Sequence, residues 1–120
     1  MLGLNEVTLL GRLGADPELR FTANGKAVCE LRLAVPGSRT GDGEPAPEWV
    51  TCVAWEALAE ACAQHLTKGS RALVRGRLAT QRWEGKDGQP RSRTVVVAGS
   101  VLFLDARSAG RRDPDDEPLE

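Results

Sequence analysis

Hydrophobic and polar residues alternate at every second position along most of the chain, as far as residue 104. The first two segments with this pattern are Asn5–Leu13 and Lys26–Val35. A period of two is typical of a β-strand with one buried face, so both segments are expected to be strands. Asp16-Pro17 and Asn24-Gly25 between them are turn sequences. The residues expected on the inner face are Val7, Leu9, Gly11 and Leu13 in the first strand and Ala27, Cys29, Leu31, Leu33 and Val35 in the second.

The pattern changes twice in the middle of the chain. Pro36–Pro47 has no apolar period and is rich in glycine and proline, which predicts a loop. Trp49–Trp55 alternates again and is expected to be the third strand. Glu56–Leu66 then takes up helical spacing and is rich in alanine, which favours one short helix that ends at Lys68-Gly69. The residues with helical spacing are Leu58, Ala59, Cys62 and Leu66.

Two more strands complete the pattern. Arg71–Trp83 and Arg91–Leu104 are the expected strands, and Glu84–Gln89 between them is a hairpin loop. Five strands with one helix between the third and the fourth is the order of an OB-fold barrel. Periodicity alone does not separate this fold from another small β-barrel, but it argues against the α/β and all-α classes. We therefore expect an all-β, five-stranded OB-fold barrel with one short helix between strands 3 and 4.

Charge is divided unevenly along the chain. The net charge of −1 combines 16 basic residues, all within residues 1–112, with 17 acidic ones. Five of the acidic residues lie in 113–120, so residues 1–112 carry +4 and the end carries −5. A basic body with an acidic end is compatible with nucleic-acid binding, which the net charge of −1 alone would not suggest. We expect one domain over residues 1–107 and a short disordered acidic tail over 108–120.

The chain has no recognisable catalytic set, phosphate-binding glycine loop or metal motif. Cys29, Cys52 and Cys62 lack zinc-site spacing and are expected to be small buried hydrophobes in a reducing compartment. The single histidine, His65, falls in the expected helix without a nucleophile beside it. No run approaches the roughly 18 apolar residues that cross a membrane. We expect a cytoplasmic, non-enzymatic protein without a cofactor, a metal or a membrane partner.

Three tryptophans account for most of the few aromatic residues. A tryptophan in a strand more often packs in the core than on the surface. Here Trp49 and Trp55 share one side of the third strand with Thr51 and Val53, while small apolar residues occupy the other side. Trp83 lies where the fourth strand enters a polar loop that cannot bury it. Three exposed tryptophans suit base stacking, with a second subunit as the alternative cover.

Basic residues alternate with apolar ones on the same strands. Arg32 lies opposite the apolar side of the second strand. In the fourth strand, Arg75 and Arg77 share a side with Trp83, and Leu78 lies on the opposite side. Such interleaving forms a groove that neutralises phosphates while the rings stack on bases, although arginine on a surface strand also serves solubility. The candidate nucleic-acid-binding residues are Trp49, Trp55, Trp83, Arg12, Arg32, Lys68, Arg75, Arg77 and Arg82.

Several motifs, in order, resemble those of bacterial single-stranded DNA-binding proteins. The opening strand runs into a turn of the form Asp-Pro-Glu-hydrophobic-Arg, and Glu-Trp begins the third strand. The resemblance covers about residues 4–104 and is specific because the order is kept. The matching residues are Asn5–Arg20, Asn24-Gly25, Glu48-Trp49, Trp55, Leu58-Ala59-Glu60, Lys68-Gly69-Ser70, Gly76-Arg77-Leu78, Trp83 and Asp87-Gly88.

The resemblance implies an OB-fold protein that binds single-stranded DNA without sequence preference in replication, recombination and repair, and that has no catalytic activity. It implies stacking by the three tryptophans, a nucleoid-associated location and a homotetramer, with a dimer as the alternative. It also implies an acidic tip that recruits replication and repair proteins. The candidates for that role are Asp115, Asp116 and Glu117.

Some positions depart from the family's pattern. A tryptophan common after the second strand is replaced by Gly37-Ser38-Arg39, so one stacking platform is missing. Val50 stands where the family often has a histidine that contributes to assembly, so the sequence does not decide whether the chain forms the tetramer. Ala57 and Gln81 replace common basic residues, and Glu56 adds a negative charge. We therefore expect weaker phosphate contacts and a shallower salt dependence than is typical of the family.

Other functions fit parts of the pattern. An OB-fold accessory factor for replication restart or RNA binding would use the same stacking. A protein-interaction module would use the tryptophans as interface anchors and would not respond to an oligonucleotide. An OB-fold hydrolase with a metal on clustered carboxylates fits least, because the acidic residues before residue 113 are dispersed. The sequence also leaves open whether the chain is a housekeeping protein or a specialised paralogue.

Overall fold

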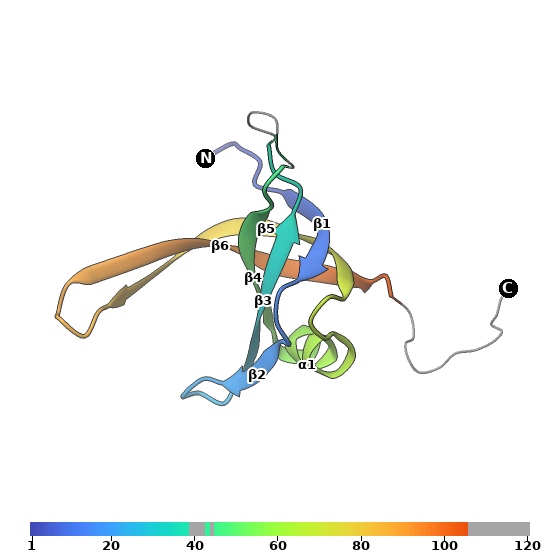
Figure 1. The fold of residues 1–120 in the computed structure, drawn as a ribbon. Helices are drawn as coiled ribbons and strands as arrows, with labels where there is room; N and C mark the ends of the chain where they lie inside the picture. Colours follow the sequence, from blue (N-terminus) through green and yellow to red (C-terminus); the bar gives the residue numbers. More distant parts are fainter. Residues whose placement is uncertain (39–42, 44, 106–120) are drawn as a thin grey trace, which may run out of the picture.

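A computed structural model of the chain shows a β-barrel with a long hairpin arm (Figure 1). The structure describes residues 1–38, 43 and 45–105. Strands make up most of this region, and one helix lies among them. The elements are β1 (Val7–Leu13), β2 (Glu18–Phe21), β3 (Ala27–Val35), β4 (Glu48–Trp55), α1 (Glu56–His65), β5 (Arg71–Glu84) and β6 (Pro90–Phe103).

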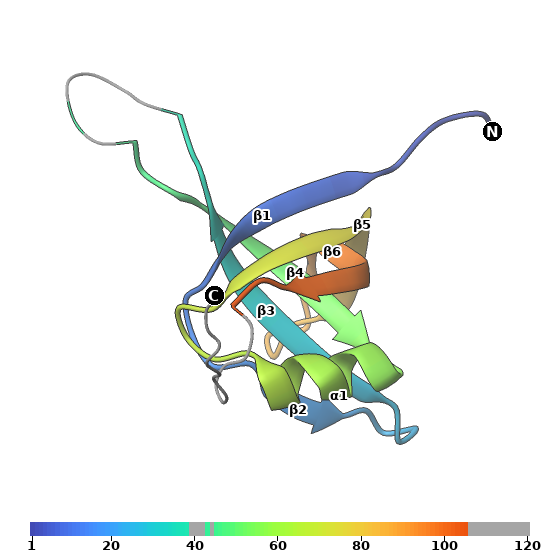
Figure 2. The ribbon, with the colours of Figure 1, turned by 90° about the vertical axis from the view of Figure 1, so that its right-hand side faces the viewer.

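Five strands close into a ring. Hydrogen-bonded neighbours follow the order β1-β5-β6-β4-β3, and β3 pairs with β1 to complete the barrel. The β4–β6 pair is parallel, and the other pairs are antiparallel. Along the chain, the helix α1 lies between β4 and β5, the third and fourth barrel strands in sequence order. It spans one end of the barrel (Figure 2). The expected five-stranded OB-fold architecture is therefore confirmed.

The short strand β2 was missing from the sequence-based expectation. It pairs with β3 as a hairpin and lies outside the closed ring. Only Leu19 in it is partly buried, and its other side chains are exposed. Four residues with one inward side chain carry no measurable apolar period, so the alternation could not reveal the strand. Its functional consequence is that it places Arg20 beside β3.

The barrel interior is filled by the side chains that the alternation placed inside. The three cysteines are buried free thiols, as expected. Burial raises the pKa of Cys52 to about 11 and that of Cys62 to about 12. Both thiols therefore stay protonated and unreactive at neutral pH. The fully buried core side chains include Cys29, Leu31, Leu33, Cys52, Ala54, Ala59, Cys62, Ala72 and Val74.

The helix α1 begins directly where β4 ends. Ala59 and Cys62 face the barrel and are buried. Trp55 is still extended, and the next residue, Glu56, has a φ of 57°, in the left-handed region that favours glycine. This single strained residue redirects the backbone from strand to helix and fixes the point at which Trp55 leaves the barrel wall.

Beyond the barrel, β5 and β6 continue as a two-stranded arm, residues 80–94, which projects far from the other strands (Figure 1). A register shift between Arg75 and Gly76 precedes it. A Cβ on Gly76 would overlap the Val97 carbonyl, so only glycine allows this close approach. Leu78, on the inward side of β5, is 50% exposed because it lies at the base of the arm. The alternation therefore identified its side of the strand but not its burial.

Candidate nucleic-acid interface

The three tryptophans lie on one outer surface that runs across β3, β4, β6 and β5. Paired residues of neighbouring strands lie on the same side of a sheet, and alternate residues along a strand share a side. The registers that connect the strands are Val28↔Trp55, Val53↔Val97 and Trp83↔Arg91. We name this surface the tryptophan face; it consists of Val28, Glu30, Arg32 and Ala34 (β3), Trp49, Thr51, Val53 and Trp55 (β4), Arg91, Arg93, Val95 and Val97 (β6), and Arg77, Ala79, Gln81 and Trp83 (β5).

Each indole on this face is open to solvent. The exposed fractions are 47% for Trp49, 37% for Trp55 and 48% for Trp83. Their exposure agrees with the side that the sequence assigned to them. Val53 differs from that expectation, because it lies on the tryptophan face and yet is only 1% exposed. Val53 is also outside the core cluster of the barrel, so its burial takes place on the outer face.

Trp49, at the start of β4, lies against the guanidinium of Arg32 and against the backbone of Gly14. The guanidinium carbon of Arg32 lies 5.4 Å from the ring centroid, within the range of a cation–π contact. The same guanidinium donates from Nη1 to Thr51 Oγ1 at 3.5 Å. The ring also lies against Gly14, where an added Cβ would be 2.5 Å from Cζ3 of the indole. Glycine at position 14 is therefore what lets the ring approach the backbone this closely.

Trp55 lies at the other end of β4. It is in register with Val28 of β3, which is itself in register with Arg20 of β2. The next residue, Glu56, already belongs to α1. Trp55 is thus fixed by the barrel strand before it and by the helix after it, and it is the least exposed of the three indoles.

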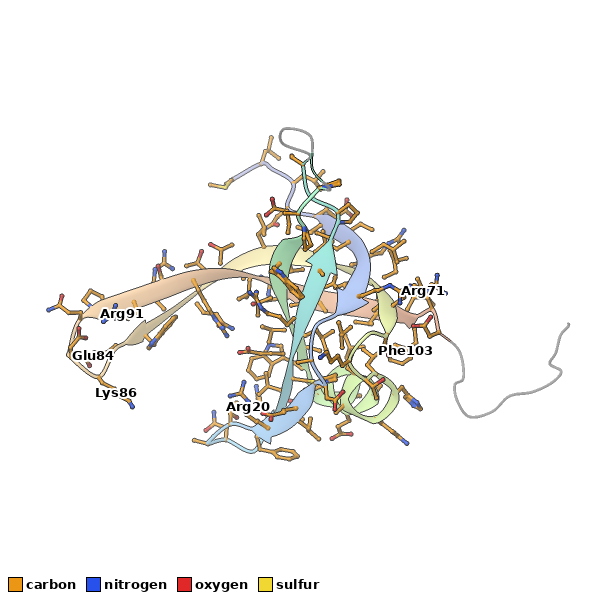
Figure 3. All side chains as sticks on the ribbon, viewed as in Figure 1. Arg20, Arg71, Glu84, Lys86, Arg91 and Phe103 are labelled. Atoms are coloured by element: carbon orange, nitrogen blue, oxygen red, sulfur yellow. The ribbon has the colours of Figure 1, made fainter. Side chains whose placement is uncertain are left out.

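Trp83 lies near the end of the arm, away from the barrel. Arg91 is opposite it in the hairpin and forms a 2.9 Å ion pair with Asp87 of the turn. Figure 3 shows Glu84, Lys86 and Arg91 together at this far end. An open hollow of about 520 Å³ here is lined by Arg82, Trp83, Glu84, Gly88, Pro90, Arg91 and Ser92. Its size and its aromatic wall suit a flat aromatic ligand such as a base.

An ion-pair cluster occupies the middle of the tryptophan face. Glu30 Oε2 accepts from Arg93 Nη2 at 2.5 Å and lies 3.4 Å from Arg20 Nη2. Arg93 also donates from Nε to Gln81 Oε1 at 2.8 Å. The hydrogen bond from Arg93 is the main cause of a lowered pKa at Glu30, and the charges of both arginines add to it. We name Arg20, Glu30 and Arg93 the Glu30 cluster.

Comparison with known proteins identifies the family. The model of the "Single-strand binding protein family" matches residues 4–104, which include the whole barrel and the arm. The chain belongs to the single-strand binding protein family. The resemblance seen in the sequence motifs is thereby confirmed.

Relatives of known name agree with this assignment. The chain is 45% identical over 108 residues to the single-stranded DNA-binding protein of Bacillus cereus, covering 89% of this chain and 64% of that protein. It is 46% identical over 108 residues to single-stranded DNA-binding protein A of Bacillus subtilis, covering 89% and 63%. For single-stranded DNA-binding protein 3 of Listeria innocua the identity is 44% over 108 residues, covering 89% and 68%. The chain thus spans less than two thirds of the length of the Bacillus relatives.

In this family member, the basic candidates on β5 fall into three positions. Arg77 lies on the tryptophan face. Arg75 shares its side of the strand but is paired with Thr8 of β1, so it lies farther round the barrel wall. Arg82 lies on the side of the arm opposite to Trp83, because adjacent residues in a strand point to opposite faces. Arg82 nevertheless lines the same hollow as Trp83 at the end of the arm.

Two other basic candidates lie at the Trp49 end of the face. Arg12 is in register with Ala34, the β3 neighbour of Trp49, and its Nη1 donates to the Gly69 carbonyl at 3.0 Å. Lys68 precedes that glycine in the same turn. These two cations therefore border the tryptophan face rather than lie on it. The partner-binding candidates Asp115, Asp116 and Glu117 lie outside the described residues.

Sequence reasoning missed Arg91 and Arg93. A usable signal was present, because counting back from the hairpin turn pairs Trp83 with Arg91 and Gln81 with Arg93. A hairpin with an outward Trp83 must therefore present both arginines on the same side.

Within residues 1–38, 43 and 45–105, no three His, Cys, Asp or Glu residues come together as a metal site would require. None of the described helices has the length and apolar character needed to cross a membrane.

Proposed function

We propose that the chain binds single-stranded DNA without sequence preference and protects it during replication, recombination and repair. The observation that carries this proposal is the presence of three half-exposed tryptophans on one arginine-bearing face. Stacking is worth roughly 1–3 kcal/mol per base and tolerates any sequence, because every base has a π-face. The printed names of the relatives support single-stranded DNA as the ligand.

Phosphate contacts would come from basic side chains around the indoles. Arg32, Arg77 and Arg91 lie on the tryptophan face and can reach a backbone that follows the stacked bases. Each phosphate neutralised on a single strand contributes about 0.7 to the slope of log K against log salt. Further phosphate contacts are proposed for the basic residues that lie outside the tryptophan face, which are Arg12, Lys68, Arg75 and Arg82.

We also propose that the chain assembles with copies of itself, as a homotetramer or as a dimer. Leu10, Leu73 and Leu102 are in register across β1, β5 and β6 and form an apolar row on the outside of the barrel. Leu10 and Leu102 are exposed. Contiguous exposed apolar rows are covered in stable assemblies. Light scattering of Leu102→Glu should therefore report a smaller species than the unmodified chain.

The acidic residues Asp115, Asp116 and Glu117 are proposed to recruit replication and repair proteins in the cytoplasm, at the nucleoid. A pull-down from lysate with and without residues 113–120 tests this role. Equal recovery of the same proteins by both chains would remove it. The chain is proposed to act by binding alone, without catalysis or a cofactor.

The decisive experiment is a titration of the intrinsic tryptophan fluorescence with oligo-dT at low and at high salt. Saturable quenching that survives moderate salt is expected if indoles stack on bases. Quenching that disappears with salt would assign binding to charge alone. Absence of quenching at both salt concentrations would refute the proposal and favour a protein-interaction module. Competition with oligo-rU in the same assay compares DNA with RNA, because stacking alone does not read the 2′-hydroxyl.

A further inference from the structure

Glu30 lies on the path between two of the stacking tryptophans. Trp49 and Trp55 are separated by about 20 Å along β4, at roughly 3.3 Å per residue. Val53 lies between them, and Glu30 is the register neighbour of Val53 on β3. A DNA strand that stacks on both indoles must therefore pass over or beside the Glu30 carboxylate. A negative charge at this point is unexpected on a face that binds a polyanion.

The two arginines of the cluster approach Glu30 from different strands. Arg20 comes from β2 and Arg93 from β6, and both contact the same carboxylate oxygen, at 3.4 Å and 2.5 Å. Guanidiniums that bind a carboxylate also match the geometry of a phosphate, so the two arginines could bind either group. The Gln81 side chain holds Nε of Arg93 from the other side at 2.8 Å. Arg93 would therefore keep an anchor if Glu30 released it.

The Arg93–Glu30 contact is a bridge across the tryptophan face. It joins β6 to β3, and β4 lies between these two strands. Val53 and Val95 lie on the tryptophan face and are only 1% exposed each. The bridge itself is open to solvent, because the side chains of Arg20, Glu30 and Arg93 are 59%, 36% and 39% exposed. Ion pairs this exposed are weak and exchange readily with other anions.

We propose that Arg20 and Arg93 form a phosphate site of the tryptophan face, and that Glu30 occupies this site in the free protein as a built-in competitor of DNA. The inference rests on the proposed function. When a backbone phosphate takes over the two guanidiniums, the Glu30 carboxylate stays on the face and repels the strand. Glu30 thus keeps the arginines extended over the face but lowers the affinity that they would otherwise give. Glu18, the register neighbour of Glu30 on β2, makes no ion pair in the described part of the chain, so it does not occupy the site.

The test is the replacement Glu30→Gln in the full chain, measured by oligo-dT quenching over a series of salt concentrations. The variant is expected to bind roughly three- to tenfold more tightly at low salt, with a salt slope steeper by about 0.7. The matched control is Glu60→Gln, which removes the same charge from the exposed side of α1 and should change affinity less than twofold. Glu30→Thr provides a second replacement with high β-propensity, should the glutamine variant fold poorly. Arg93→Gln in the Glu30→Gln background should abolish the gain.

Each outcome decides a different statement. If the unmodified chain quenches with oligo-dT and Glu30→Gln behaves like Glu60→Gln, the competitor role of Glu30 is wrong while the proposed function stands. Weaker binding by both Glu30 variants, with unchanged thermal unfolding, would make Glu30 a positioning residue and would also refute the proposal. If neither the unmodified chain nor any variant responds to oligo-dT, the proposed function itself fails.

Discussion

The barrel section of the tryptophan face and the arm present their indoles on very different supports. Trp49 and Trp55 stand on β4, which pairs with β3 along its whole length and with β6 at Cys52 and Val53. Trp83 stands on a ribbon of two strands, with only its hairpin partner beside it. A two-stranded ribbon is marginally stable alone, whereas a strand inside a closed sheet opens only with the barrel.

This contrast separates a fixed platform from an adjustable one. On the barrel, Gly14 and Arg32 determine where the Trp49 ring lies before any ligand arrives. On the arm, the hollow beside Trp83 is open and has no core beneath it. In the proposed stacking mode, binding to the barrel indoles would therefore require little ordering, while binding to the arm would lose part of its stacking energy to the ordering of the ribbon.

The largest expected difference comes from removing one indole of each kind. Trp55→Ala should weaken oligo-dT binding by about 1–3 kcal/mol, and Trp83→Ala by less, near 1 kcal/mol. Quenching titrations or anisotropy with labelled oligo-dT would measure both. Phenylalanine at each position is the control, since it keeps a stacking face. An equal or greater loss at Trp83 would show that the arm is as well ordered as the barrel.

A smaller effect should follow from disturbing the support of one barrel indole. Gly14→Ala places a methyl group 2.5 Å from Cζ3 of Trp49 in the present geometry, so the ring must move. Affinity for oligo-dT should fall by about 1 kcal/mol, as expected for partial loss of one stacked base. Gly3→Ala is the control, because nothing lies within 4 Å of an added Cβ there. An unchanged affinity would mean that Trp49 adapts as freely as Trp83.

The junction beneath Trp55 allows the stability of the fixed platform to be tested. Glu56→Gly removes a side chain from a residue with a φ of 57° and should raise the free energy of unfolding by about 0.5–1 kcal/mol, after the entropy cost of glycine is subtracted. Urea unfolding measures the change. Glu56→Gln removes the charge but keeps the strained backbone, so it should leave stability nearly unchanged. Equal stabilisation by both variants would assign the effect to charge.

The smallest expected effect is the pH dependence contributed by the Glu30 cluster. Because the pKa of Glu30 is lowered in the folded chain, mainly by the Arg93 hydrogen bond, the unfolded chain binds this proton first as the pH falls below 4.5. The stabilisation is thus complete above that pH and is lost as the pH falls through the folded pKa. The free energy of unfolding of Glu30→Gln, measured by chemical denaturation, should fall less steeply with decreasing pH than that of the unmodified chain. The difference between the two proteins should be less than about 1 kcal/mol. A parallel decline in the two proteins would contradict the assignment.

The hydrophobic alternation predicted the barrel and failed where burial has another origin. The strands around Leu31, Leu33 and Val74 were predicted correctly because a closed interior excludes polar side chains at every second position. Val53 is buried on the outer face, away from the core cluster, and such a tertiary arrangement leaves no period in the sequence. Leu78 has the correct period, but the backbone leaves the barrel there.

The candidate site shows the same division. Strand parity and polar surroundings identified the tryptophans, because those are local properties of the sequence. Arg82 was chosen for its place next to Trp83; adjacent residues of a strand point to opposite sides, yet both residues line the hollow at the end of the arm. The Glu30 cluster joins residues 20, 30 and 93, so it could be found only once the register of three strands was known.

The three buried cysteines allow the opening of the barrel to be measured through the rate at which their thiols are modified. Cys29 and Cys52 belong to barrel strands, Cys62 to the helix, and no cysteine lies in the arm. A thiol reagent can modify them only while the barrel is open, because burial keeps them covered and protonated. The rate of modification therefore records breathing of the barrel and is blind to motion of the arm. A ligand that stabilises the closed barrel must therefore lower the rate of thiol modification, even if it leaves the arm free to move.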